Sequence, residues 1–131
     1  MNRFLILFIL CCSLSCACSK DGGEMLHIVP DKVELSWESQ QFQVTCLEHY
    51  YIVKTLSIDE AFQGAPMRFD DLSETYSFDL EWLHWSYKKG NDYATVSVDA
   101  NDTGKVRHAQ INMVDGWDAW GRLTITQQPK E

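Results

Sequence analysis

The amino-acid sequence predicts an all-β protein, a two-sheet antiparallel β-sandwich of one domain. Apolar and polar residues alternate in three runs near the C-terminus, YATVSVDA, RHAQINMV and RLTITQQ, at 93–100, 107–114 and 122–128. This alternation is typical of strands with one buried face. Segments rich in Gly, Asn and Asp separate the runs, as turns require. Because no sustained helical period occurs, short strands joined by such turns favour a sandwich.

The N-terminus has the features of an export signal. Arg3 precedes an apolar run at 4–10, which is too short to span a bilayer. A small residue directly before Cys18, and the polar run SKDGGE after it, resemble a bacterial lipoprotein signal, in which the cysteine becomes the lipidated N-terminus. Ser15 stands where leucine is usual, so Cys16 is a second candidate for lipidation.

This interpretation divides the chain into a signal peptide at 1–17, a lipidated tether at 18–24 and a β-sandwich at 25–131. More than one acyl chain is needed for stable anchoring, and the lipidated cysteine would supply it. We therefore expect an extracytoplasmic, membrane-anchored protein of the bacterial outer membrane or cell surface. An ordinary secreted protein cut near Ala17 is the alternative, and the choice between the periplasmic and the surface leaflet stays open.

Removal of the leader, with Cys18 lipidated, leaves Cys46 as the one free cysteine of the mature chain. A single thiol forms no intramolecular disulfide, so the domain must be stabilised by its core. Cys46 follows Phe42 and Val44 on the apolar side of a predicted strand, where it acts as a small hydrophobe. Nineteen Asp and Glu against eleven Lys and Arg give a net charge of −8, which argues against a nucleic-acid partner.

Four further strands are predicted before the three alternating runs. They cover Val33 to Trp37, Phe42 to Cys46, Tyr51 to Ile58 and Glu81 to Tyr87. Trp82 and Trp85 have opposite parity in the last of these, so one of them should face the core. Tyr50 and Tyr51 should be divided in the same way.

The segment 59–79 interrupts this series, because it is longer than a loop of a sandwich should be. Pro66 and two acidic pairs break any periodicity, yet the segment contains several large apolar side chains: Phe62, Met67, Phe69, Tyr76 and Phe78. We expect an insertion that folds back on one edge of the domain, with a short strand near Tyr76. Such a segment is either a functional loop or a structural cover of the sheet edge.

The C-terminal half, residues 82–128, resembles the BACON domain, an immunoglobulin-like module of Bacteroidetes surface proteins. The resemblance lies in the order of a tryptophan-led strand, a valine-alternating strand ending in Ala100 and Asn101, Arg107 before the next strand, and a final strand ending in Ile125-Thr126-Gln127. Residues 29–45 match the opening strands more loosely. The resemblance implies an immunoglobulin-like sandwich and a role in carbohydrate recognition, for instance of mucin glycan, or a role as a spacer. The insertion at 59–79 departs from the pattern of the family.

Signatures of catalysis or of metal binding were not found. The histidines at 27, 49, 84 and 108 are scattered, and no hydrolase or nucleotide motif occurs, so we expect no enzyme, metal site or cofactor. DANDTG at 99–104 approaches a calcium loop, but Thr103 replaces a carboxylate and Gln110 replaces the closing glutamate. A hairpin turn in which Asn101 and Gly104 supply positive φ is the interpretation we prefer.

The stretch VDGWDAWGRL at 114–123 contains the candidate binding residues Trp117, Asp118, Trp120 and Arg122. Alternation from the core residue Leu123 places Trp120 and Arg122 on the outer face, and Trp117 in the turn. An exposed indole with polar neighbours is what a sugar ring requires. The hypothesis is a glycan-binding module; the alternative is a spacer or a module that binds proteins of a surface complex and has no glycan affinity.

Overall fold

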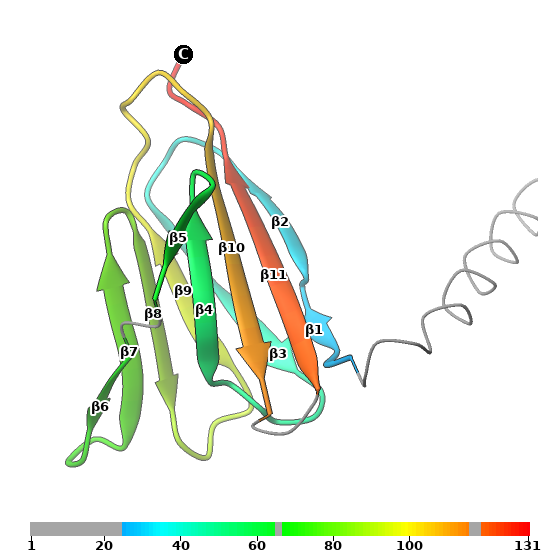
Figure 1. Cartoon of the computed structure of the whole chain (residues 1–131). Coiled ribbons are helices and arrows are strands. Elements are labelled where there is room, and N and C mark those ends of the chain that lie inside the picture. The colour runs from blue at the N-terminus through cyan, green and yellow to red at the C-terminus, as the bar shows by residue number, and fades with distance from the viewer. Residues whose placement is uncertain (1–24, 65–66, 116–118) are drawn as a thin grey trace, which may run out of the picture.

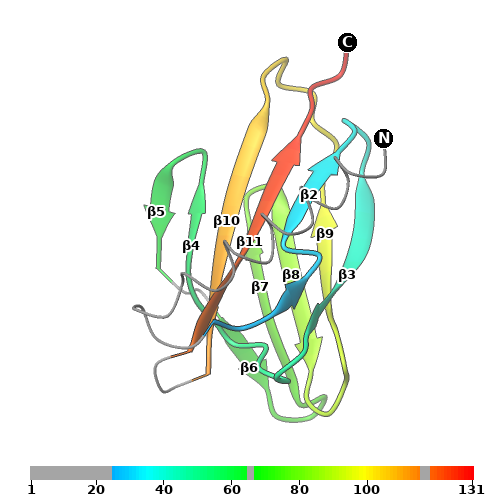
Figure 2. The ribbon, with the colours of Figure 1, turned by 90° about the vertical axis from the view of Figure 1, so that its right-hand side faces the viewer.

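The computed structural model describes residues 25–64, 67–115 and 119–131. Two β-sheets pack face to face in this part of the chain (Figures 1 and 2). The strands are β1 Ile28–Val29, β2 Lys32–Leu35, β3 Gln40–Cys46, β4 Val53–Ile58, β5 Ala61–Gln63, β6 Arg68–Asp70, β7 Thr75–Leu80, β8 Leu83–Lys88, β9 Ala94–Val98, β10 Arg107–Val114 and β11 Trp120–Gln127. The prediction of an all-β sandwich is therefore confirmed.

One sheet has six strands in the order β1-β3-β9-β8-β7-β6, and the other has five in the order β2-β11-β10-β4-β5. The pairs are antiparallel with one exception, because β2 pairs with β11 in parallel. A parallel neighbour needs a crossover, and here the chain leaves β1 in one sheet and joins the edge of the other. Within the described ranges, no helix has the length and apolar character that crossing a membrane takes.

The core lies between the two sheets and is built from the inward residues of the alternating strands. Val44, Trp85 and Val96 of the six-stranded sheet, and Ile111 and Leu123 of the five-stranded sheet, are all buried. Cys46 is buried with them, as its place on the apolar face predicts. Burial raises the pKa of the Cys46 thiol, so this group behaves as a small apolar side chain.

The segment 59–79 differs from the expected folded-back loop, because most of it is strand. β5 forms the edge of the five-stranded sheet, and β6 and β7 complete the edge of the other sheet. Of its apolar residues, Phe78 is buried in the core, whereas Phe62 and Phe69 are exposed. The strand expected near Tyr76 exists as β7, but the segment extends both sheets and does not cover one edge.

Of the two predictions from parity, the one for the tryptophans is wrong and the one for the tyrosines is confirmed. Trp82 and Trp85 are both buried, because Trp82 lies in the turn before β8, and the Arg107 guanidinium lies 5.4 Å from the centre of its ring. Tyr50 and Tyr51 are divided as predicted, with Tyr50 exposed and Tyr51 buried.

The DANDTG segment is not a hairpin turn, because it joins β9 of one sheet to β10 of the other. Gly104 has the expected positive φ of 75°, but Asn101 does not. The Asn101 side chain is buried; its amide donates to the Lys105 carbonyl at 2.7 Å, and its oxygen accepts from the Thr103 hydroxyl at 2.7 Å. Asn101 therefore organises a crossover between the sheets.

Candidate functional site

The outer face of the five-stranded sheet carries the candidate binding residues that the structure describes. Trp120 is 37% exposed and pairs with Val114 of β10, and Arg122 pairs with Asn112. Ala119 and Gly121, the neighbours of Trp120 along the chain, are both buried. Trp120 and Arg122 thus point outward, as the alternation from Leu123 predicts.

Arg122 is held in place by a cross-strand chain of hydrogen bonds. Its Nε donates to Oδ1 of Asn112 at 3.0 Å, and Nδ2 of Asn112 donates to the Thr55 hydroxyl at 3.0 Å. The guanidinium carbon lies 5.8 Å from the centre of the Trp120 ring, within the range of a cation–π interaction. A guanidinium carries several N–H donors in one plane. This arrangement therefore presents fixed N–H groups beside an accessible indole.

The N-terminal segment packs beside Trp120 and is anchored by backbone contacts. The amide of Leu26 donates to the Trp120 carbonyl at 2.8 Å, and Met25 forms a parallel bridge with Trp120. The contact depends on Gly121, because a Cβ there would lie 2.8 Å from Cγ1 of Ile28. The N-terminal segment can therefore approach β11 this closely only because Gly121 has no side chain.

Glu48 fixes the same segment from the other side. Its carboxylate oxygens accept hydrogen bonds from the backbone amide of His27 at 2.9 and 3.0 Å and also contact Nδ1 of His27. Burial alone would raise the pKa of Glu48, but the hydrogen bonds from His27 outweigh it and lower this pKa. The N-terminal segment is thus tied to both sheets.

These contacts form an open groove, here called the Trp120 groove, of about 700 Å³. Trp120, Arg122 and Thr124 form one side of it, and the N-terminal segment with Leu47 forms the other. Met25, Val29 and Leu47 are exposed apolar residues of the second side. The groove therefore combines an indole, a guanidinium and exposed apolar side chains with the polar side chains of Asp31 and Lys32.

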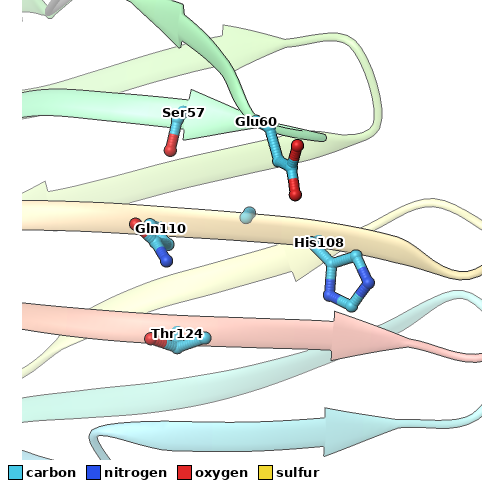
Figure 3. A pocket seen from close by; sticks show the side chains of 6 residues that line it. Ser57, Glu60, His108, Gln110 and Thr124 are labelled. Carbon is cyan, nitrogen blue, oxygen red and sulfur yellow. The ribbon is translucent and has the colours of Figure 1, made fainter.

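A second depression, here called the Gln110 hollow, lies farther along the same face and measures about 410 Å³. Figure 3 shows its polar side chains: Ser57, His108, Gln110 and Thr124 project from one face of β4, β10 and β11, and Glu60 projects from the turn between β4 and β5. Thr124 lines both the hollow and the Trp120 groove, so the two are adjacent.

The turn between β4 and β5 positions Glu60 at the rim of the Gln110 hollow. Asp59 and Glu60 have positive φ angles of 48° and 67°, which costs energy for residues other than glycine. Asp59 offsets this cost through His108: its amide donates to the His108 carbonyl at 2.8 Å, and its Oδ1 accepts from the His108 amide at 2.8 Å. The turn is thereby clamped onto β10, with the Glu60 side chain above the hollow.

Trp117 and Asp118 of the predicted site, and the lipidation candidate Cys18, lie outside the described residues. Ser57, His108 and Gln110 were missed by the sequence analysis, although their outward parity marks them as surface positions. The register that brings them together joins β4, β10 and β11, and a single sequence does not give that register. No group of three or more potential metal ligands occurs within the described ranges.

Comparison with known proteins supports the fold. No protein family model and no curated protein matches the sequence. The NMR structure of a protein from Bacteroides thetaiotaomicron is similar with a TM-score of 0.60 at 13% identity, covering 86% of this chain and 94% of that one. A GH5 xyloglucanase from Bacteroides ovatus, solved in complex with a XXXG heptasaccharide, aligns with a TM-score of 0.48 at 15% identity, covering 81% of this chain and 19% of that one. At 13% identity the first likeness shows the fold alone.

Proposed function

We propose that this protein is a cell-envelope lipoprotein whose BACON-like β-sandwich binds carbohydrate, such as mucin or another glycan, and catalyses no reaction. The observation that carries this proposal is the exposed Trp120 ring with the Arg122 guanidinium fixed beside it. The C–H face of a sugar ring packs on an indole, and directed N–H donors bind its hydroxyl groups. Asn112 supports this role because it fixes Arg122 before any ligand arrives, which reduces the entropy cost of binding.

In this proposal the signal peptide covers 1–17, Cys18 carries the lipids, and residues 18–24 tether the domain to the membrane. The chain from Cys18 to Met25 spans at most about 25 Å when fully extended. Because Met25 pairs with Trp120, the Trp120 groove lies close to the membrane. The rest of the outer face extends from the N-terminal segment toward the loop between β9 and β10 (Figure 1).

A glycan array followed by titration calorimetry on wild type and Trp120→Ala tests the binding function. We expect the wild type to bind at least one glycan, and the variant to lose at least about thirtyfold in affinity, the effect of removing a central aromatic contact of about 2 kcal/mol. Phe69→Ala is the matched control, because Phe69 is an exposed aromatic residue of the other sheet. It should leave the affinity unchanged. The absence of binding to every mucin, host and dietary glycan on the array would overturn the proposal.

A second candidate function is a spacer or protein-docking module without sugar affinity. The exposed apolar residues Met25, Val29 and Leu47 favour it, because they would suit a protein of a surface complex as well as a ligand ring. Crosslinking in intact envelopes separates the two functions. A docking module gives a protein adduct that Leu47→Asp abolishes, while the glycan array gives background only.

A further inference from the structure

The depressions on the outer face of the five-stranded sheet form one continuous track. The Trp120 groove meets the Gln110 hollow at Thr124. The Gln110 hollow in turn shares Glu60 and His108 with a third depression of about 410 Å³, which is lined by residues of the β9–β10 loop such as Lys105. The track therefore follows β10 and β11 from the N-terminal segment to the far end of the sheet.

Strand register places rows of polar residues, paired across neighbouring strands and here called rungs, one after another along this track. Asn112 pairs with Arg122 and Thr55, and the next outward rung joins Gln110 to Thr124 and Ser57. Trp120 and the rung that joins His108 to Thr126 lie at opposite ends of β11, about 20 Å apart at the usual strand rise. This span exceeds the length of one sugar ring several times.

The Gln110 hollow is suited to hydroxyl groups without charge. Hydroxyls of Ser57 and Thr124 and the amide of Gln110 offer both donors and acceptors. The permanent charge in the hollow itself is the Glu60 carboxylate, which repels carboxylate or sulfate groups there. The net charge of −8 adds to this repulsion at long range. The cationic side chains of the track lie outside the hollow, with Lys32 and Arg122 at one end and Lys105 and Arg107 at the other.

Resting on the proposed glycan-binding function, we propose that the ligand is an extended oligosaccharide that stacks on Trp120 at one end and follows the strands, with uncharged units across the Gln110 hollow. The single indole at one end provides the stacking contact. The rungs beyond it provide hydrogen bonds to successive sugar units, so the affinity grows with chain length. Shallow, open depressions fit a chain that lies on the sheet and not a small molecule enclosed in a cavity.

Titration calorimetry with cello-, xylo- and manno-oligosaccharides, from disaccharide to hexasaccharide, tests this inference. We expect the affinity within the bound series to rise at least about tenfold from disaccharide to hexasaccharide. Gln110→Ala should lower the hexasaccharide affinity about tenfold, as the loss of well-formed hydrogen bonds does, and leave the disaccharide affinity unchanged. Oligogalacturonate should bind more weakly than the neutral hexasaccharide, and Glu60→Gln should narrow that difference.

Ser86→Ala is the control, because Ser86 points outward from the six-stranded sheet; it should bind every ligand like the wild type. Equal affinities for disaccharide and hexasaccharide would overturn the extended track while the glycan-binding function stands. Tighter binding of oligogalacturonate would overturn the assignment of uncharged units across the Gln110 hollow. Failure of the wild type to bind any of these series overturns the inference, and a positive glycan array would show that the binding function survives it.

Discussion

The outer faces of the two sheets follow the same alternation but carry different side chains. Across the middle of the six-stranded sheet, the outward rung consists of Thr95, Ser86 and Ser77. On the five-stranded sheet the outward residues include Trp120 and Arg122. A small polar residue is sufficient for a solvated strand face, and the fold gives no reason to expose an indole there. The difference is the reason for placing the proposed binding site on the five-stranded sheet.

The largest expected effect is a loss of stability at Gly121, where the N-terminal segment packs on β11 beside Trp120. In Gly121→Ala the new Cβ would lie 2.8 Å from Ile28 and 3.0 Å from Leu26, atoms that move only with the backbone or with a buried side chain. We expect a loss of about 2 kcal/mol in the free energy of unfolding, as overpacking usually causes. The melting temperature should fall by roughly 10 °C, which scanning calorimetry measures.

Gly64→Ala is the matched control for this variant, because no atom lies within 4 Å of a Cβ at Gly64. Its melting temperature should stay within a few degrees of the wild type. An equal fall in both variants would show that the loss comes from glycine replacement in general and not from the close packing of the N-terminal segment on β11.

A smaller effect, on glycan affinity and not on stability, is expected at Asn112. This residue lies on the outer face of the five-stranded sheet, so its replacement leaves the core unchanged. In Asn112→Ala, Arg122 loses the acceptor of its Nε and Thr55 loses a donor, so the guanidinium is no longer fixed beside Trp120. We expect glycan affinity to fall about tenfold and the melting temperature to change little, because the side chain is only partly buried. Ser86→Ala on the opposite face should change neither quantity. Unchanged affinity in Asn112→Ala would show that the orientation of Arg122 does not contribute to binding.

Local alternation made the central strands and the outward position of Trp120 predictable. One face of each of β3, β9, β10 and β11 is apolar along most of its length, so parity alone assigns each side chain to the core or to solvent. The burial of Cys46 follows from the same argument. For such residues, the information needed is contained in about six neighbouring positions.

Features that depend on distant residues were not predictable. A strand near Tyr76 was predicted and exists as β7, but the acidic pairs and Pro66 concealed β5 and β6 of the segment 59–79. Parity failed for Trp82 because Glu81, with a φ of 53°, places it in a tight turn where strand alternation does not apply. The Gln110 hollow was missed for a different reason: it arises from the register of β4 against β10 and from the clamp between Asp59 and His108.

The smallest expected effect is on the pH dependence of stability, and it concerns His84. This residue lies on the outer face of the six-stranded sheet between two carboxylates. Its Nδ1 is 2.8 Å from Asp79 and its Nε2 is 3.0 Å from Asp99. Burial alone would lower the pKa of His84, but the hydrogen bonds and charges of Asp79 and Asp99 outweigh it and raise this pKa. The protonated imidazole therefore stabilises the folded state.

A folded-state pKa above the unfolded value of about 6.5 means that this stabilisation is complete below about pH 6.5 and is lost as the pH rises through the folded pKa. Urea unfolding should show wild type more stable than His84→Gln near pH 5.5, by at most about 1 kcal/mol because both carboxylates are exposed, with a smaller difference at pH 8.5. A difference that does not change with pH would contradict the ion-pair explanation. Glycan affinity should be the same in both proteins at either pH, because His84 lies on the face without Trp120; a loss in His84→Gln would show that the two faces are not independent.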